Sequence, residues 1–138
     1  MNYLLDTNVI SETRRKRPDQ GVLAFIKQSA ASSLFVSVLS LGELIKGAAL
    51  ISKRDPEQGQ ALHDWIIGIR AEFQDQMIGI DGAIAEIWGR MSSERPLPVI
   101  DGLIAATAQA RGLVLVTRNI RDFEDLGITL INPWTGAS

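Results

Sequence analysis

Five polar side chains in this chain of 138 residues have the types and positions that chemistry at phosphate groups requires. They are Asp6, Glu43, Asp101, Asn119 and Asp122. Oxygen ligands of this kind, without cysteine or a nearby histidine, suit Mg²⁺ or Mn²⁺ better than zinc. A metal ion held among carboxylates generates a hydroxide and stabilises charge on the attacking and leaving oxygens of a phosphate. The pattern therefore predicts a magnesium or manganese site that serves phosphate chemistry.

Short apolar runs alternate with amphipathic helices along the chain, and most of these runs are continuous rather than alternating. This pattern favours an α/β fold in which helices cover both faces of a parallel sheet. The expected strands are residues 3–5, 34–38, 77–80, 113–117 and 128–131. The expected helices are residues 9–12, 19–31, 40–52, 59–73, 81–91, 100–110 and 120–126.

The predicted sheet brings the five side chains to one edge, because the carboxyl ends of parallel strands lie together and ligands bind there. Asp6 ends the first strand, and Glu43 is expected in the first turn of the helix after the second strand. Asp101 is expected in the first turn of the helix that leads into the fourth strand. That helix must run antiparallel to the strand, so its amino-terminal end lies beside the strand's carboxyl end. We therefore expect the three carboxylates to converge, with Asn119 and Asp122 close by.

Each of these residues also has a structural alternative. Asp6 can cap the helix that follows it, and Asp122 suits a cap or a turn. Glu43 and Asp101 can complement helix dipoles. Carboxylates crowded at an apolar sheet edge would, however, repel one another and take up protons unless a cation lay among them. Considered together, they favour a metal site.

The composition sets limits on the class of protein. The chain has no cysteine, which excludes disulfides, thiolate zinc sites and a cysteine nucleophile and favours a reducing, cytoplasmic location. No apolar stretch approaches the ~20 residues that a membrane span needs. The formal net charge of −2 argues against broad electrostatic binding to nucleic acid, so local basic groups or metal ions would have to hold a polyanion. The length predicts one domain, residues 1–138.

Four arginines and the single histidine are the remaining candidates for binding a phosphate or for catalysis. Arg118 and Arg121 flank the proposed site, where either can hold a phosphate. Arg14 and Arg15 belong to a basic loop that is either solvated or in contact with a nucleic-acid backbone. His63 lies in the middle of an amphipathic helix, which favours a surface or packing role over catalysis.

Other chemistries lack their motifs. The chain has no G-x-S-x-G nucleophile elbow and no glycine-rich phosphate loop with its lysine. The tryptophans are interpreted as core or interface anchors; they are Trp65, Trp88 and Trp134. The helix 40–52 is apolar on more than one side, because Leu41 and Leu44 lie nearly opposite Leu39 and Leu50. We expect it to be covered on two sides, one of them by another subunit.

Four segments resemble the PIN-domain ribonucleases, and most closely the toxins of bacterial type II toxin-antitoxin pairs of the VapC and FitB kind. They are Leu4-Leu5-Asp6-Thr7-Asn8, residues 37–44, residues 101–108 and residues 115–123, and the closing Ile131-Asn132-Pro133-Trp134 is typical of the FitB-like branch. The resemblance implies a three-layer α/β/α PIN-like domain and Mg²⁺- or Mn²⁺-dependent endonucleolytic cleavage of RNA. It also implies a homodimer and a cognate antitoxin whose tail covers the groove. Toxin and antitoxin would bind DNA as a complex, and the toxin can form an assembly larger than a dimer within that complex.

By position, the resemblance assigns Asp6, Glu43 and Asp101 to the acidic triad that holds the metal. The fourth acidic position of the family's site corresponds to either Asn119 or Asp122. Asn119 is expected to orient water or the Asp6 carboxylate, and Asp122 to be an outer metal ligand or a structural cap. The number of metal ions stays open as well. Hydrogen-bonding groups that fix the carboxylates are expected at three further positions, namely Thr7, Asn8 and Thr117.

Two other functions stay possible from the sequence. A phosphotransfer domain of the receiver or haloacid-dehalogenase type also places aspartates and Mg²⁺ at strand ends, but Asp6-Thr7-Asn8 lacks the second aspartate of an Asp-x-Asp signature. A catalytically silent PIN-like module that only binds a partner is disfavoured by the intact acidic triad.

Overall fold

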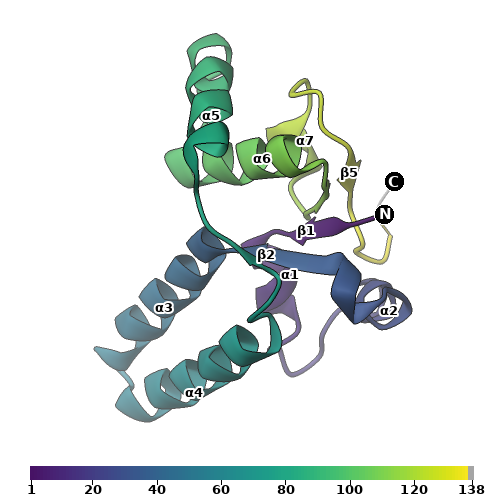
Figure 1. Ribbon diagram of the computed structural model, residues 1–138. Coiled ribbons are helices and arrows are strands. Elements are labelled where there is room, and N and C mark those ends of the chain that lie inside the picture. The colour runs from purple at the N-terminus through teal and green to yellow at the C-terminus, as the bar shows by residue number, and fades with distance from the viewer. Residues whose placement is uncertain (137–138) are drawn as a thin grey trace.

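A five-stranded parallel sheet forms the centre of residues 1–136, the part of the chain that this computed structural model describes (Figure 1). Across the sheet the strands are β3 (Met77–Ile78), β2 (Leu34–Ser37), β1 (Tyr3–Leu5), β4 (Val114–Val116) and β5 (Leu130–Ile131). β1 is central, and Leu4 is in register with Phe35 of β2 and Leu115 of β4. The predicted parallel sheet is confirmed.

The order of the strands creates a switch point between β1 and β4. The chain builds β2 and β3 outward on one side of β1 and then returns to place β4 and β5 on the other side. Such a reversal leaves a crevice outside the carboxyl ends of the two strands where the order changes. Asp6 and Thr117, the residues that directly follow β1 and β4, therefore border this crevice.

Helices cover both faces of the sheet, which confirms the three-layer α/β/α arrangement. The helices are α1 (Thr7–Glu12), α2 (Gln20–Gln28), α3 (Val38–Ser52), α4 (Pro56–Glu72), α5 (Gly82–Glu94), α6 (Val99–Arg111) and α7 (Ile120–Phe123), with a 3-10 turn, η1 (Ala31–Ser33). Figure 1 shows α5, α6 and α7 above the sheet and α1, α2 and α4 below it, with α3 running beside α4. None of the helices among the described residues is long and apolar enough to cross a membrane.

Each face of the sheet packs on its own core. Leu4 and Leu115 point to the core beneath α5, α6 and α7, whereas Leu5 and Val116 point to the core above α1, α2 and α4. This alternation follows from the two-residue period of a strand. Each of these four side chains is at most 2% exposed, and burying such a side chain stabilises a fold by roughly 1.5–3 kcal/mol. Both layers are thus held to the central strands that carry the site.

Local caps set the starts of several helices. Asp19, Asp55 and Asp81 each accept a hydrogen bond from the backbone N–H three residues ahead, at 3.0–3.1 Å. Gly112, with a φ of +63°, ends α6 in the left-handed conformation, as expected of a closing glycine. The Asp55 cap makes α4 begin at Pro56, three residues before the expected start.

The expected place of Glu43 in a first helical turn is wrong. α3 begins at Val38, directly after β2, because the Ser37 hydroxyl caps it by accepting from the Leu39 N–H at 3.0 Å. Glu43 therefore lies in the second turn, and the helix dipole gives it less stabilisation than a first-turn position would.

One apolar side of α3 is uncovered in the isolated chain. Ile45 is 40% exposed and Leu50 is 53% exposed, whereas Ala48 is buried against the fold. The expectation that this helix is covered on two sides is thus not met by the chain's own residues. The second cover, expected to be another subunit, stays a prediction.

Candidate active site

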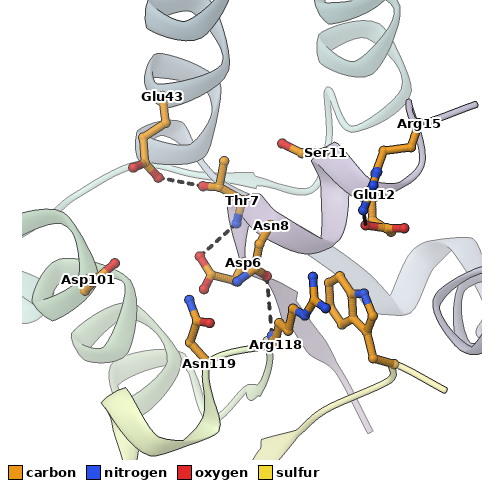
Figure 2. Close-up of a pocket in the computed structure, with 11 residues that line it drawn as sticks. Asp6, Thr7, Asn8, Ser11, Glu12, Arg15, Glu43, Asp101, Arg118 and Asn119 are labelled. Carbon is orange, nitrogen blue, oxygen red and sulfur yellow. Dashed lines mark hydrogen bonds and ion pairs between the residues drawn. The ribbon is translucent and has the colours of Figure 1, made fainter. Parts of the chain in front are cut away.

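A pocket of about 470 Å³ opens at the switch point, and several predicted residues line it (Figure 2). Four of them are the carboxylates Asp6, Glu43 and Asp101 and the amide Asn119. Asp122 does not line this pocket. It lies in an adjoining hollow of about 640 Å³, which shares Arg118 and Asn119 with the first and contains Arg121. The structure therefore brings four of the five expected residues into one pocket and places Asp122 next to it.

Asp6 is a buried carboxylate of the pocket, at 6% exposure. Its Oδ1 accepts from the Thr7 N–H at 2.8 Å, so it caps α1, and its Oδ2 accepts from the Thr117 hydroxyl at 2.8 Å. Burial raises the pKa of this carboxyl above its ordinary value, against the two hydrogen bonds that lower it, and the nearby charges of Asp101 and Glu43 raise it further. Asp6 thus both caps the helix and faces the pocket.

Thr117 connects the ends of β1 and β4 through its hydroxyl. The hydroxyl donates to Asp6 and accepts from the backbone N–H of Asn119 at 3.1 Å and from the Asn8 amide Nδ2 at 3.5 Å. The Asn8 Oδ1 in turn accepts from the Arg118 N–H at 3.5 Å. The side chain of Thr117 is fully buried, so water does not compete for these bonds.

Glu43 reaches the pocket from α3 and is held by α1. Its Oε1 accepts from the Thr7 hydroxyl at 2.6 Å, and the Thr7 and Ser40 hydroxyl oxygens are 2.8 Å apart. One hydroxyl carries one hydrogen, and a carboxylate can only accept, so Thr7 donates to Glu43 while Ser40 donates to Thr7. This chain of bonds fixes one oxygen of Glu43 and leaves the other free.

Asp101 approaches from the opposite side, in the first turn of α6 as predicted. Figure 2 shows its carboxylate directed toward the space between Glu43 and Asp6. Burial raises the pKa of Asp101, and the charges of Glu43 and Asp122 raise it further. The carboxylates are therefore close enough to repel one another, and the charge of Asp122 adds to this repulsion from outside the pocket.

The donor set fits a hard divalent cation. Among the described residues, no group of three or more Asp, Glu, His or Cys side chains already has positions that suit a metal ion, so the coordination sphere is not preformed. Within the same residues, none of Asp6, Glu43 and Asp101 forms an ion pair. A bound Mg²⁺ or Mn²⁺ would stabilise the ionised forms of Asp6 and Asp101, whose pKa values are raised, and would balance the charge of the three carboxylates.

The arginines expected to bind RNA line the pocket or one of the two hollows next to it. Arg118 and Arg15 line the pocket itself, and Arg121 lines the adjoining hollow. Arg14 lines a third hollow, of about 210 Å³, which shares Thr7 and Glu43 with the pocket. All four therefore line the pocket or a hollow that shares residues with it.

Sequence reasoning missed Glu12, Ser11 and Trp134 as pocket-lining residues. Glu12 is 5% exposed; it accepts from the Asp19 N–H at 2.9 Å and pairs with Arg15 at 3.4 Å. Its position one helical turn after Asn8 was the available signal, since residues four apart share a helix face. Trp134 was expected only as an anchor, and it does pack partly against the core beside α1 and α2.

His63 is exposed on α4, as expected of a surface histidine, and does not line the pocket.

Comparison with known proteins places the chain in a family. Residues 3–128 match the family model described as PIN domain. The chain is 31% identical over 138 residues to the VapC ribonuclease Y4jK of Sinorhizobium fredii, covering 97% of this chain and 99% of that relative. The crystal structure of FitAcB from Neisseria gonorrhoeae superposes with a TM-score of 0.88 at 30% identity, covering 96% of this chain and 98% of that one. A toxin-antitoxin complex from Klebsiella pneumoniae contains a chain with a TM-score of 0.72 at 25% identity, with coverage of 96% and 98%. The resemblance seen in the four sequence segments is confirmed, and the chain belongs to the PIN domain family.

Proposed function

We propose that this protein is the toxin of a type II toxin-antitoxin system and acts as a divalent-metal-dependent endoribonuclease. The observation that carries the proposal is the meeting of Asp6, Glu43 and Asp101 at the switch point of a PIN domain. The similarity to a VapC ribonuclease over nearly the whole chain supports RNA cleavage, and ribonucleases of this family are generally metal-dependent. Residues 1–138 are proposed to act as one domain.

The three carboxylates would hold the cation, Mg²⁺ or Mn²⁺, with Asp122 as an outer ligand. A bound ion of this kind supplies a hydroxide at neutral pH and stabilises charge on the phosphate oxygens. The protein's part is to keep the carboxylates ionised and oriented. Thr117 holds one oxygen of Asp6 through a 2.8 Å hydrogen bond, and Thr7 holds one oxygen of Glu43. Positioning groups of this kind commonly decide metal affinity.

Asn119 is proposed to act on the substrate side of Asp6. Figure 2 shows its side-chain amide directed toward the Asp6 carboxylate, while its backbone N–H is held by Thr117. An amide at this place can orient a water molecule or the carboxylate without adding charge. Asp122, in the adjoining hollow, adds a negative charge that acts on Asp101.

The partners follow from the proposed toxin role. A cognate antitoxin is supported by the similarity to a chain of a toxin-antitoxin complex, and the pair would bind DNA as a complex. A homodimer is proposed through the uncovered side of α3, where Ile45 and Leu50 are exposed. RNA would enter over the arginines that border the pocket; these are Arg118, Arg121, Arg15 and Arg14.

The test is to incubate purified, antitoxin-free protein with cellular RNA and Mn²⁺ and to sequence the cleaved ends. We expect cleavage that stops when EDTA removes the metal ion, and no cleavage by Asp6→Asn or Asp101→Asn. Asp75→Asn is the matched control, because Asp75 is an exposed aspartate two residues before β3, at the opposite edge of the sheet. Full activity of Asp6→Asn or Asp101→Asn would contradict the site, and failure of the wild-type protein to cleave any RNA would contradict the function.

A further inference from the structure

Arg118 and Trp134 form a stacked pair in the wall of the pocket. The guanidinium carbon of Arg118 is 5.2 Å from the centre of the Trp134 ring system, within the range of a cation–π contact. Both residues line the pocket that holds the carboxylates. In Figure 2, Arg118 lies across Asp6 from Glu43 and Asp101. Arg118 therefore lies on the side of the pocket away from Glu43 and Asp101, with Trp134 against its guanidinium.

The side chain of Arg118 is not used to neutralise an acidic residue. Arg118 is exposed, and within residues 1–136 its guanidinium forms no ion pair, although four carboxylates line the same pocket. Arg15, in contrast, pairs with Glu12. The guanidinium of Arg118 thus keeps its hydrogen-bond donors and its outer face available to a ligand.

The backbone holds both members of the pair in place. The Asn132 side chain links them, because its Nδ2 donates to the Arg118 carbonyl at 3.4 Å and its Oδ1 accepts from the Trp134 N–H at 3.0 Å. On the other side of Trp134, the Thr135 N–H and hydroxyl donate to Asp19 at 2.9 and 3.0 Å. The Trp134 backbone is thus fixed on both sides.

Close packing at Gly21 adds to this clamp. A Cβ at Gly21 would lie 2.2 Å from the Pro133 carbonyl oxygen and 2.8 Å from the Thr135 N, so only glycine lets this backbone approach α2 so closely. The Gly21 N–H also donates to the Thr135 hydroxyl at 2.9 Å. A surface that is held in this way loses little freedom when a ligand binds.

The chemistry of the pair matches an unpaired nucleobase. Bases of single-stranded RNA stack on aromatic rings and on guanidinium planes, and such stacking tolerates every base because each has a π face. The hollow that contains Arg121 adjoins the pocket at Arg118 and Asn119, which offers the strand a surface to follow. A base in a duplex has no free face, so the pair would accept only an unpaired nucleotide.

We propose that the Arg118–Trp134 stack is a nucleobase subsite that binds an unpaired base next to the phosphate that is cleaved. The proposal rests on the proposed ribonuclease function. It assigns Trp134 a role in substrate binding and gives Arg118 a planar stacking role beyond that of a positive charge.

The test measures binding without cleavage. Antitoxin-free protein in EDTA is titrated into fluorescently labelled single-stranded RNA oligonucleotides that carry one abasic nucleotide at each position in turn, with fluorescence anisotropy as the readout. We expect one position, or two adjacent ones, at which removing the base weakens binding by about 5- to 150-fold in the wild-type protein. A duplex of the same sequence is expected to bind more weakly than the single strand.

The variants separate stacking from charge. In Trp134→Ala and in Arg118→Lys, we expect the abasic nucleotide to cause no further loss at that position, because either the ring or the planar guanidinium is missing. Trp134→Phe keeps an aromatic face and should retain most of the discrimination. Arg118→Lys changes only an exposed side chain and keeps its charge, so it tests the proposal even if Trp134→Ala fails to fold.

Two results would overturn the inference. One is that no abasic position weakens RNA binding by the wild-type protein, although this protein cleaves RNA with Mn²⁺. That result would leave the proposed ribonuclease function standing. The other is discrimination against the abasic nucleotide that stays at the wild-type level in Arg118→Lys and in Trp134→Ala. Absence of Mn²⁺-dependent RNA cleavage by the wild-type protein would instead contradict the proposed function, and the subsite with it.

Discussion

Thr117→Val is the substitution that most directly probes how the site is held. Valine has nearly the same shape as threonine, so the fully buried position stays filled, but the hydroxyl that donates to Asp6 at 2.8 Å is lost. A hydrogen bond to a charged acceptor contributes about 1.5–3 kcal/mol, and we expect the metal-free protein at neutral pH to lose that much unfolding free energy. The hydroxyl also accepts from the Asn119 N–H, so the loop after β4 is expected to loosen.

The larger effect is expected on metal binding. Loss of a group that orients a ligating carboxylate typically lowers metal affinity by about 10- to 100-fold. Isothermal titration with Mn²⁺ gives the affinity, and urea unfolding with and without Mn²⁺ gives the stability. RNA cleavage at subsaturating Mn²⁺ should fall in parallel and recover in part when more Mn²⁺ is added.

Two control variants separate this role from burial. Thr117→Ser keeps the hydroxyl and should retain most of the Mn²⁺ affinity. Thr107→Val alters another fully buried threonine, whose hydroxyl donates only to the Leu103 carbonyl within α6 at 2.8 Å. That bond competes with helix structure, so its loss should cost less than about 1 kcal/mol and leave Mn²⁺ binding unchanged. Equal Mn²⁺ affinity in Thr117→Val and the wild-type protein would refute the positioning role.

Three further perturbations test other parts of the structure. Asp101→Asn should stabilise the metal-free protein at neutral pH, because burial and the charge of Glu43 raise the pKa of Asp101, so its ionised form disfavours the folded state. This advantage should shrink as the pH falls toward the ordinary pKa of 3.8, because Asp101 of the folded wild-type protein takes up its proton above that pH. Urea unfolding at several pH values would show whether it does. Gly59→Ala should destabilise the protein by about 1–3 kcal/mol, because a Cβ there would lie 2.7 Å from the Ser52 Cα, whereas Gly68→Ala in the same helix meets open space and should stabilise by roughly 0.5–1 kcal/mol. Equal thermal shifts for the two glycine variants would contradict this packing. His63→Ala should cleave RNA at the wild-type rate, since His63 is exposed on α4 and outside the pocket. A large loss of cleavage would instead identify His63 as a general base of the reaction.

The sequence by itself determined which segments form strands and helices and the edge of the sheet where the carboxylates meet, but not where α3 and α4 begin. The continuous apolar runs predict buried parallel strands. Asp6 directly follows such a strand, so it must lie at the edge of the sheet where the carboxyl ends of the strands meet. Asp101 was predictable for a similar reason, because a helix that leads into a strand must return antiparallel to it. Helix caps such as Asp19 and Asp81 involve residues three apart, so local sequence suffices to predict them.

Only the tertiary structure decided which side chains hold the site together. Thr117 and Asp6 are 111 residues apart in the sequence, and Thr7 and Glu43 are 36 apart, so no local pattern pairs them. Similarly, Trp134 becomes a wall of the pocket because Asn132 and Asp19 fix the backbone around it. Periodicity and capping depend on neighbours along the chain, whereas the direction of a side chain depends on whatever distant segments pack beside it, and that is known only once the chain has folded.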